Sequence, residues 1–142
     1  MTDDRPALPA SCTRNLRTVM LVCGTVEALA SIAVCLPRDV MSIAYQSLRL
    51  GEMPDVALFG YLARSASLLW AVHGVLVIAL AGDVLRYLPM IKLLGWLTIV
   101  MGVAFLGIDF YEGLPAWWSL SEGPIVIVMG AIYVSLARKL GS

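Results

Sequence analysis

The sequence predicts an all-α polytopic membrane protein, a bundle of four transmembrane helices with a short interfacial helix in the first loop. Four long apolar segments lie at residues 18–36, 59–81, 91–108 and 121–137, close to the length of about 20 residues that crosses a bilayer. Hydrophobic residues make up 60% of the chain and charged residues only 14%, against about 25% charged residues in soluble domains. Small residues also recur at regular spacing within two of the segments.

We expect a single transmembrane domain over residues 14–142, preceded by a disordered cytoplasmic tail at residues 1–13, which is polar and has no period. The first span ends at Pro37, which cannot continue a helix. Arg14 and Arg17 ahead of an apolar run also resemble the start of a signal peptide, but Glu27 interrupts that run. A retained helix is therefore the preferred interpretation.

The first loop, residues 38–58, is the only long connection in the sequence. Asp39 suits the start of a short helix that continues to about Leu50. Apolar side chains repeat on one face of this helix, which is typical of a helix lying in the membrane interface: Met41, Ala44, Tyr45 and Leu48.

The later connections carry helix signals and aromatic anchors. Pro89 suits the first turn of the third span. The last loop, residues 110–120, contains Trp117 and Trp118, whose amphipathic rings favour the membrane interface. Ser119 and Glu122 have the spacing of a capping box, which predicts that the last helix begins there.

Lys and Arg are distributed unequally between the two sides of the predicted bundle. The side with both chain ends and the second loop holds Arg5, Arg14, Arg17, Arg86, Lys92, Arg138 and Lys139. The other side holds Arg38, Arg49 and Arg64 together with most of the acidic residues. The positive-inside rule then predicts that both termini are cytoplasmic. Free cysteines in the first span and short loops fit a bacterial inner membrane.

Small residues form a stripe along two of the predicted helices. Gly60, Ser67 and Gly74 recur every seven residues in the second span, and Gly95 and Gly102 do so in the third. Small residues allow helix backbones to approach closely in a bilayer, so these positions predict helix–helix contacts.

Arg64 and Asp109 continue these two stripes, and Arg64 therefore faces protein. We predict that Arg64 pairs with Asp109, Glu122 or both in the outer leaflet, because a guanidinium can serve two carboxylates. Two alternatives stay open: Arg64 can extend to the outer headgroups, or the three residues can bind an anionic ligand.

Glu27 and His73 lie near the middle of the first and second spans, at similar depths. A carboxyl–imidazole pair at the bilayer centre is a candidate proton relay, because ionisable groups in spans are so often functional. The alternative is structural: a protonated or hydrogen-bonded Glu27 and a histidine that serves packing.

The sequence contains no catalytic, nucleotide-binding or EF-hand motif, so we predict no catalytic residues, no metal and no cofactor, and favour a protein that is not an enzyme. Haem is disfavoured because the chain has a single histidine. The basic residues are scattered between the helices, which argues against nucleic acid as a partner. The expected partners are the lipid bilayer, other membrane subunits, or further copies of the chain.

Chain length, four spans, both ends inside and glycine-striped helices resemble small bacterial four-helix membrane proteins of the DoxX-like kind. The resemblance is one of architecture. It implies a membrane oxidoreductase as a candidate partner, as for some DoxX-like proteins. The sequence favours a non-catalytic accessory or assembly subunit of a larger membrane complex. Two alternatives stay open: a small oligomeric transporter or channel subunit that uses Glu27 and His73, and a quinone- or lipid-binding subunit of a membrane oxidoreductase.

Overall fold

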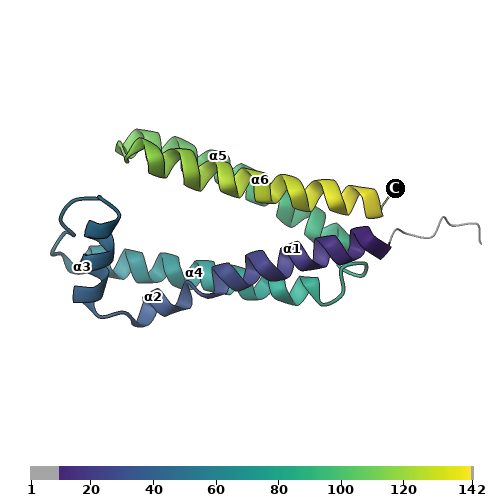
Figure 1. Ribbon diagram of the computed structural model, residues 1–142, viewed down its shortest axis with the longest axis horizontal. Coiled ribbons are helices and arrows are strands. Elements are labelled where there is room, and N and C mark those ends of the chain that lie inside the picture. Colours follow the sequence, from purple (N-terminus) through teal and green to yellow (C-terminus); the bar gives the residue numbers. More distant parts are fainter. Residues whose placement is uncertain (1–9, 142) are drawn as a thin grey trace, which may run out of the picture. The chain divides into compact units, whose positions relative to one another are not determined.

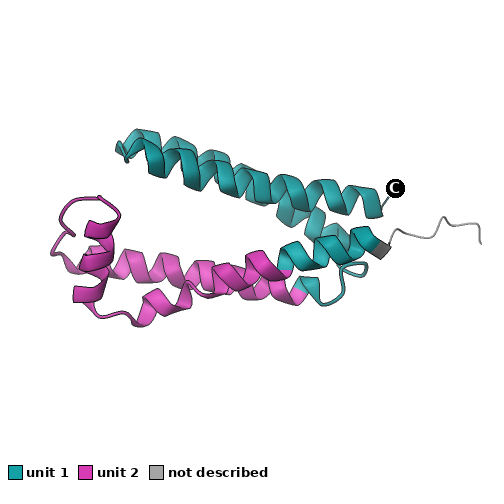
Figure 2. Ribbon diagram, in the orientation of Figure 1, with its two compact units in different colours: residues 1–20, 80–142 teal, residues 21–79 magenta. Residues whose placement is uncertain are grey.

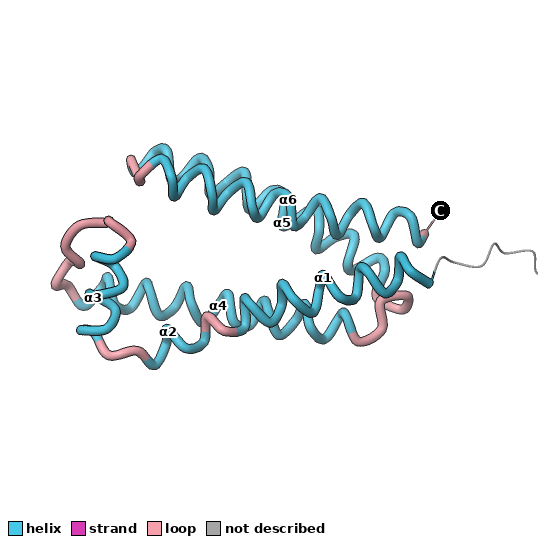
Figure 3. Tube along the Cα trace, viewed as in Figure 1, coloured by secondary structure: helices cyan, strands magenta, loops and turns pink. Residues whose placement is uncertain are grey.

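The computed structural model describes residues 10–141, and these residues form six helices and no strand (Figure 1). The helices are α1 (Ala10–Ala28), α2 (Ser31–Cys35), α3 (Arg38–Ser47), α4 (Ala57–Ala81), α5 (Leu88–Glu112) and α6 (Ala116–Leu140). Loops are confined to short links and to the segment between α3 and α4 (Figure 3). The predicted all-α class is confirmed.

Within residues 10–141, four segments are long and apolar enough to cross a membrane: Ser11–Cys35, Ala57–Ala81, Leu88–Glu112 and Ala116–Leu140, each of 25 residues. At 1.5 Å per residue a helix of this length extends about 38 Å, which exceeds the hydrocarbon core of about 30 Å. Large apolar side chains are exposed along all four segments, as lipid contact requires; examples are Val26, Leu69, Val100 and Ile125. The chain is a multi-pass membrane protein.

The chain divides into two compact units (Figure 2). Unit 1 contains residues 1–20 and 80–142, and unit 2 contains residues 21–79. The division passes through α1 and close to the carboxyl end of α4. The expectation of one transmembrane domain over residues 14–142 stays a prediction.

In unit 1, α5 and α6 form an antiparallel pair whose backbones meet at glycines. A Cβ placed on Gly95 would lie 3.0 Å from the Gly130 carbonyl oxygen, and one on Gly102 would lie 2.8 Å from that of Gly123. Side chains larger than hydrogen would force the two helices apart at both levels. These contacts agree with the packing role that the sequence assigns to Gly95 and Gly102.

In unit 2, α1 and α4 approach in the same way at a single level. A Cβ on Gly74 would lie 2.5 Å from both the Gly24 carbonyl oxygen and the Ala28 amide nitrogen. A Cβ on Gly60, another small residue of the α4 stripe, would have no such backbone neighbour from another helix. The nearest atom to a Cβ on Gly60 belongs to Arg64, and the Ser67 hydroxyl donates to the Ala63 carbonyl within its own helix at 2.8 Å.

The helix ends differ most from the sequence prediction at the amino ends of α1 and α6. Residues 10–13, expected in the disordered tail, belong to α1, while residues 1–9 lie outside the described residues. The last helix begins at Ala116 instead of near residue 121, and Pro115 is its N-cap residue. Ser119 is therefore inside α6, and the predicted capping box of Ser119 and Glu122 is wrong.

Candidate intramembrane site

Glu27 on α1 and His73 on α4 come together in unit 2 because of the close helix approach beside them. Gly74 follows His73 directly, and a Cβ on Gly74 would lie 2.8 Å from Cβ of Glu27. The absence of a side chain at Gly74 thus lets α1 come near enough for the Glu27 side chain to reach the neighbouring imidazole. The small-residue stripe and the polar pair are two parts of one arrangement.

The Glu27 carboxyl and the His73 imidazole share a hydrogen bond of 2.7 Å between Oε2 and Nδ1. The Glu27 side chain is 9% exposed and that of His73 is 24% exposed. Glu27 Oε1 is buried and has no hydrogen-bond partner among the described residues. The imidazole and the Trp70 ring also pack at nearly right angles, with the ring centroids 6.0 Å apart.

The proton in the hydrogen bond between Glu27 and His73 can be carried by either side chain. A charged or neutral imidazole can donate from Nδ1 to the carboxylate, or a neutral carboxyl can donate to an unprotonated Nδ1. A hydrogen bond persists in both cases, so the couple can gain or lose a proton without separating. Whether it acts as a relay stays a prediction.

The first membrane segment is interrupted two residues after Glu27, where a turn at residues 29–30 separates α1 from α2 (Figure 3). The Ala30 amide donates to the Glu27 carbonyl, and the Ile32 amide donates to that of Leu29, each at 3.0 Å. Both bonds reach three residues back instead of four. As a result, the carbonyls of Val26 and Ala28 lack the amide donor that a continuous helix would supply.

Thr25 adds to this distortion, because its hydroxyl donates to the Leu21 carbonyl one turn earlier at 2.7 Å. Such bonds bend helices in apolar surroundings. Neither Gly nor Pro occurs at the interruption, so no helix-breaking residue in the sequence indicates it. The hydroxyl of Thr25 beside Glu27 was the available signal.

Arg64 on α4 has a role in unit 2 that the sequence analysis missed. Its Nη2 donates to the Leu36 carbonyl at 2.9 Å, and its Nε donates to the Val34 carbonyl at 3.2 Å. Because α2 ends at Cys35, the carbonyls of Val34 and of the flanking residue Leu36 have no later amides of the same helix as donors. The guanidinium supplies donors instead, with a further, longer bond of 3.5 Å to the Gly60 carbonyl.

Asp109 and Glu122, the predicted partners of Arg64, belong to unit 1, so the predicted pairing stays a prediction. Asp109 is 4% exposed, and its Oδ2 has no hydrogen-bond partner among the described residues. Glu122 accepts a hydrogen bond from Nε1 of Trp118, one turn earlier on α6. Trp117 packs edge-on against Trp118, with ring centroids 5.5 Å apart. Their role as interface anchors stays a prediction.

Glycines of α1 and α6 complete the close helix contacts, and those of α6 were not assigned to helix packing from the sequence. Gly24 faces Gly74, and Gly123 and Gly130 face Gly102 and Gly95. The signal was present in α6, where Ala116, Gly123, Gly130 and Ala137 recur every seven residues.

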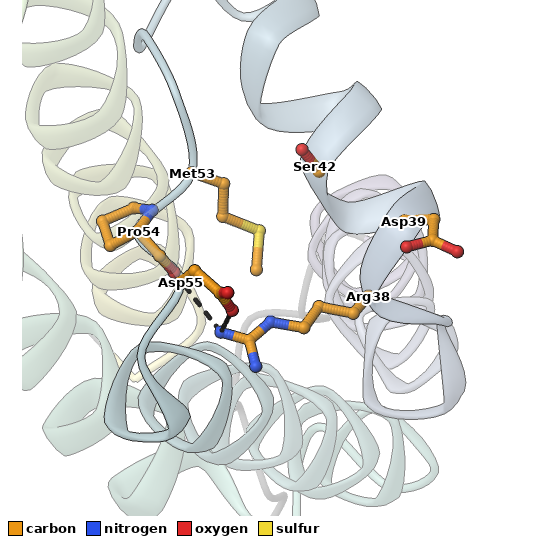
Figure 4. A pocket seen from close by; sticks show the side chains of 6 residues that line it. All are labelled: Arg38, Asp39, Ser42, Met53, Pro54 and Asp55. Atoms are coloured by element: carbon orange, nitrogen blue, oxygen red, sulfur yellow. Dashed lines mark hydrogen bonds and ion pairs between the residues drawn. The ribbon is translucent and has the colours of Figure 1, made fainter.

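A polar pocket of about 260 Å³ lies in unit 2 between α3 and the segment before α4 (Figure 4). Arg38 reaches across it, contacting Asp55 Oδ1 at 3.1 Å and the Val56 carbonyl at 3.0 Å. Its guanidinium points at Asp55 and Pro54, while Asp39 and Ser42 line the side formed by α3 (Figure 4). The contacts of Arg38 thus link the start of α3 to the segment that precedes α4.

Within the described residues, no group of three or more His, Cys, Asp or Glu side chains is placed to hold a metal ion. Comparison with known proteins finds no matching family model, no significantly similar curated protein and no significantly similar solved structure. The inference of function therefore depends on the arrangement of the residues themselves.

Proposed function

We propose that this protein is a proton-binding subunit of a membrane transport system and that Glu27 and His73 are its working groups. The observation that carries the proposal is the 2.7 Å hydrogen bond between two ionisable side chains on different membrane helices, one of them nine-tenths buried. Ionisable groups in spans are costly, at about 2.5–3.5 kcal/mol each on insertion scales, and commonly mark ion and proton pathways.

The interruption of the first span supports the same function. Discontinuous helices in transporters leave backbone carbonyls free to interact with coupling ions near the bilayer midplane. Here the carbonyls of Val26 and Ala28, on either side of Glu27, lack their helical amide donors. An interrupted helix also bends more easily than a continuous one, which suits a group that must meet each side of the membrane in turn. Four spans are few to enclose a path, so we expect the protein to act as an oligomer.

The test is proton flux in proteoliposomes that contain a pH-sensitive dye, with a potential imposed by potassium and valinomycin. We expect the wild-type protein to carry protons and expect Glu27→Gln and His73→Gln to lower the flux at least tenfold. Glu122→Gln is the matched control, because it neutralises a carboxyl that is hydrogen-bonded within α6. Flux that persists in both variants of the couple would contradict the proposal, as would its absence in wild type.

The second candidate is the non-catalytic accessory or assembly subunit, and one feature of α5 favours it. A Cβ on Gly107 would meet no atom within 4 Å, and Ala104, one turn earlier, is also exposed. Small exposed residues in a span let the helix of another subunit approach. Native mass spectrometry of protein extracted from its own membranes tests this candidate. Foreign subunits at fixed stoichiometry that are lost from the Gly107→Leu variant would support this candidate. A preparation that contains only this chain would count against it.

A further inference from the structure

Cationic side chains gather at one end of unit 1, where the carboxyl end of α6 meets the start of α5. The thiol of Cys12 donates to the Leu136 carbonyl at 3.7 Å, which brings the start of α1 to the same end. The cationic residues there are Arg14, Arg17, Arg86, Lys92, Arg138 and Lys139, and Asp83 is the nearby acid in the sequence. Within residues 10–141 none of these cations forms an ion pair.

One of these cations lies beside an exposed tryptophan, and a second is one helical turn away from that tryptophan on α5. The Arg138 guanidinium stands 5.5 Å from the centroid of the Trp96 ring, which is 48% exposed. Lys92 precedes Trp96 by one turn of α5, so both side chains leave the same face of that helix. The Lys92 ammonium lies at the end of α6, 2.5 Å from where a Cβ on Gly141 would be.

The directions of α5 and α6 determine where the two charged groups lie along the membrane normal. Side chains lean toward the amino end of their own helix. Lys92 on α5 therefore leans toward the membrane surface, whereas Arg138 on α6 leans back toward the apolar span and over Trp96. The arrangement holds a guanidinium beside exposed apolar surface, with Leu93 and Leu97 next to it on α5.

We propose that Lys92, Arg138 and Trp96 bind the headgroup of an anionic phospholipid. The guanidinium can bind phosphate oxygens in pairs, and the ammonium adds a second charge. The Trp96 ring and the neighbouring leucines offer an apolar surface for the acyl chains below the phosphate. Basic sites between helices at a membrane surface commonly bind such lipids. A free phosphate would use the two charges but gain nothing from the apolar surface.

The test is binding of phosphatidylglycerol to the full chain in nanodiscs of phosphatidylcholine, measured by native mass spectrometry and by titration of Trp fluorescence. We expect wild-type protein to prefer phosphatidylglycerol. The double variant Lys92→Gln, Arg138→Gln should bind it about 30-fold more weakly, because each direct contact of a cationic group with the phosphate adds about fivefold. Trp96→Leu, which keeps an apolar side chain, should also weaken binding in the mass spectrometric measurement.

The matched control is Arg14→Gln, Arg17→Gln, which removes the same charge from the same end without touching Trp96. We expect this control to weaken binding less than threefold. Equal losses in both double variants would overturn the proposal in favour of diffuse attraction to an anionic surface. Competition by millimolar inorganic phosphate would overturn it in favour of a simple anion site, and binding to an acidic partner protein without any lipid preference would also overturn it.

Discussion

Gly24 on α1 and Gly74 on α4 face each other so closely that a Cβ on Gly74 would lie 2.5 Å from the Gly24 carbonyl oxygen. Real side chains do not approach a backbone this closely, so α1 must move away if Gly74 carries one. The hydrogen bond between Glu27 and His73 depends on the same approach. A change at Gly74 therefore affects both the packing of unit 2 and its polar pair.

We predict that Gly74→Ala destabilises the protein by about 1–3 kcal/mol, the usual range for an overpacked contact. The free energy of unfolding in mixed micelles is the measurement. Gly107→Ala is the matched control, because a Cβ at that position meets no atom within 4 Å. Alanine also forms helices better than glycine, so the control should be neutral or slightly stabilising. Equal stability of the two variants would contradict the close contact.

The Glu27–His73 bond should appear as a coupling energy between the two positions. In a double-mutant cycle with Glu27→Leu and His73→Leu, we expect coupling of about 1 kcal/mol or more, because each single change strands a buried polar group. A second cycle, of Glu27→Leu with Ser67→Ala, should be additive, since Ser67 bonds within its own helix. Additivity in the first cycle would show that the two side chains do not interact in the membrane.

Arg64→Gln should destabilise unit 2, because it removes donors from the carbonyls of Val34 and Leu36 at the end of α2. We expect a loss of about 1–3 kcal/mol, the cost of leaving partly buried acceptors unpaired. Arg49→Gln, which removes the same charge at an exposed site in the same unit, should be close to neutral. If both changes are neutral, the bonds of Arg64 do not contribute to stability.

A double-mutant cycle of Arg64→Gln with Asp109→Asn separates these backbone contacts from the ion pair predicted from the sequence. Coupling above about 0.5 kcal/mol would support the pairing of Arg64 with Asp109. An additive result would assign the effect of Arg64 to the carbonyls alone.

The four spans were predictable because a run of apolar residues long enough to cross a bilayer has few other stable fates. Their ends were not, since polar and aromatic residues at the surface continue the helices beyond the apolar runs. The last helix, for example, extends from Ala116 through the tryptophans that the sequence placed in a loop. Hydropathy locates the part of a helix in hydrocarbon and carries little information about the turns beyond it.

The candidate site was predictable only in part. Equal depth placed Glu27 and His73 at one level, but depth alone does not say that two helices touch on those faces. The bonds of Arg64 to Val34 and Leu36 depend on where α2 ends in space, which the spacing of residues along α4 does not contain. Backbone carbonyls beyond the end of a helix are good acceptors for a guanidinium, and a sequence pattern of charges does not indicate them.

For Ser119→Ala, the sequence pattern and the structure predict changes in stability of opposite sign. As a helix cap it would contribute about 1 kcal/mol, and Ser119→Ala would be destabilising. In the structure Ser119 lies inside α6, is 0% exposed, and its hydroxyl has no hydrogen-bond partner among residues 10–141. We therefore expect Ser119→Ala to be neutral or stabilising, because it removes an unpaired buried polar group and favours the helix.

Ser121→Ala is the control for general serine removal on α6, since that hydroxyl donates to the Trp118 carbonyl at 2.9 Å. A loss of about 1 kcal/mol or more in Ser119→Ala alone, measured as the free energy of unfolding, would restore the helix start near residue 121.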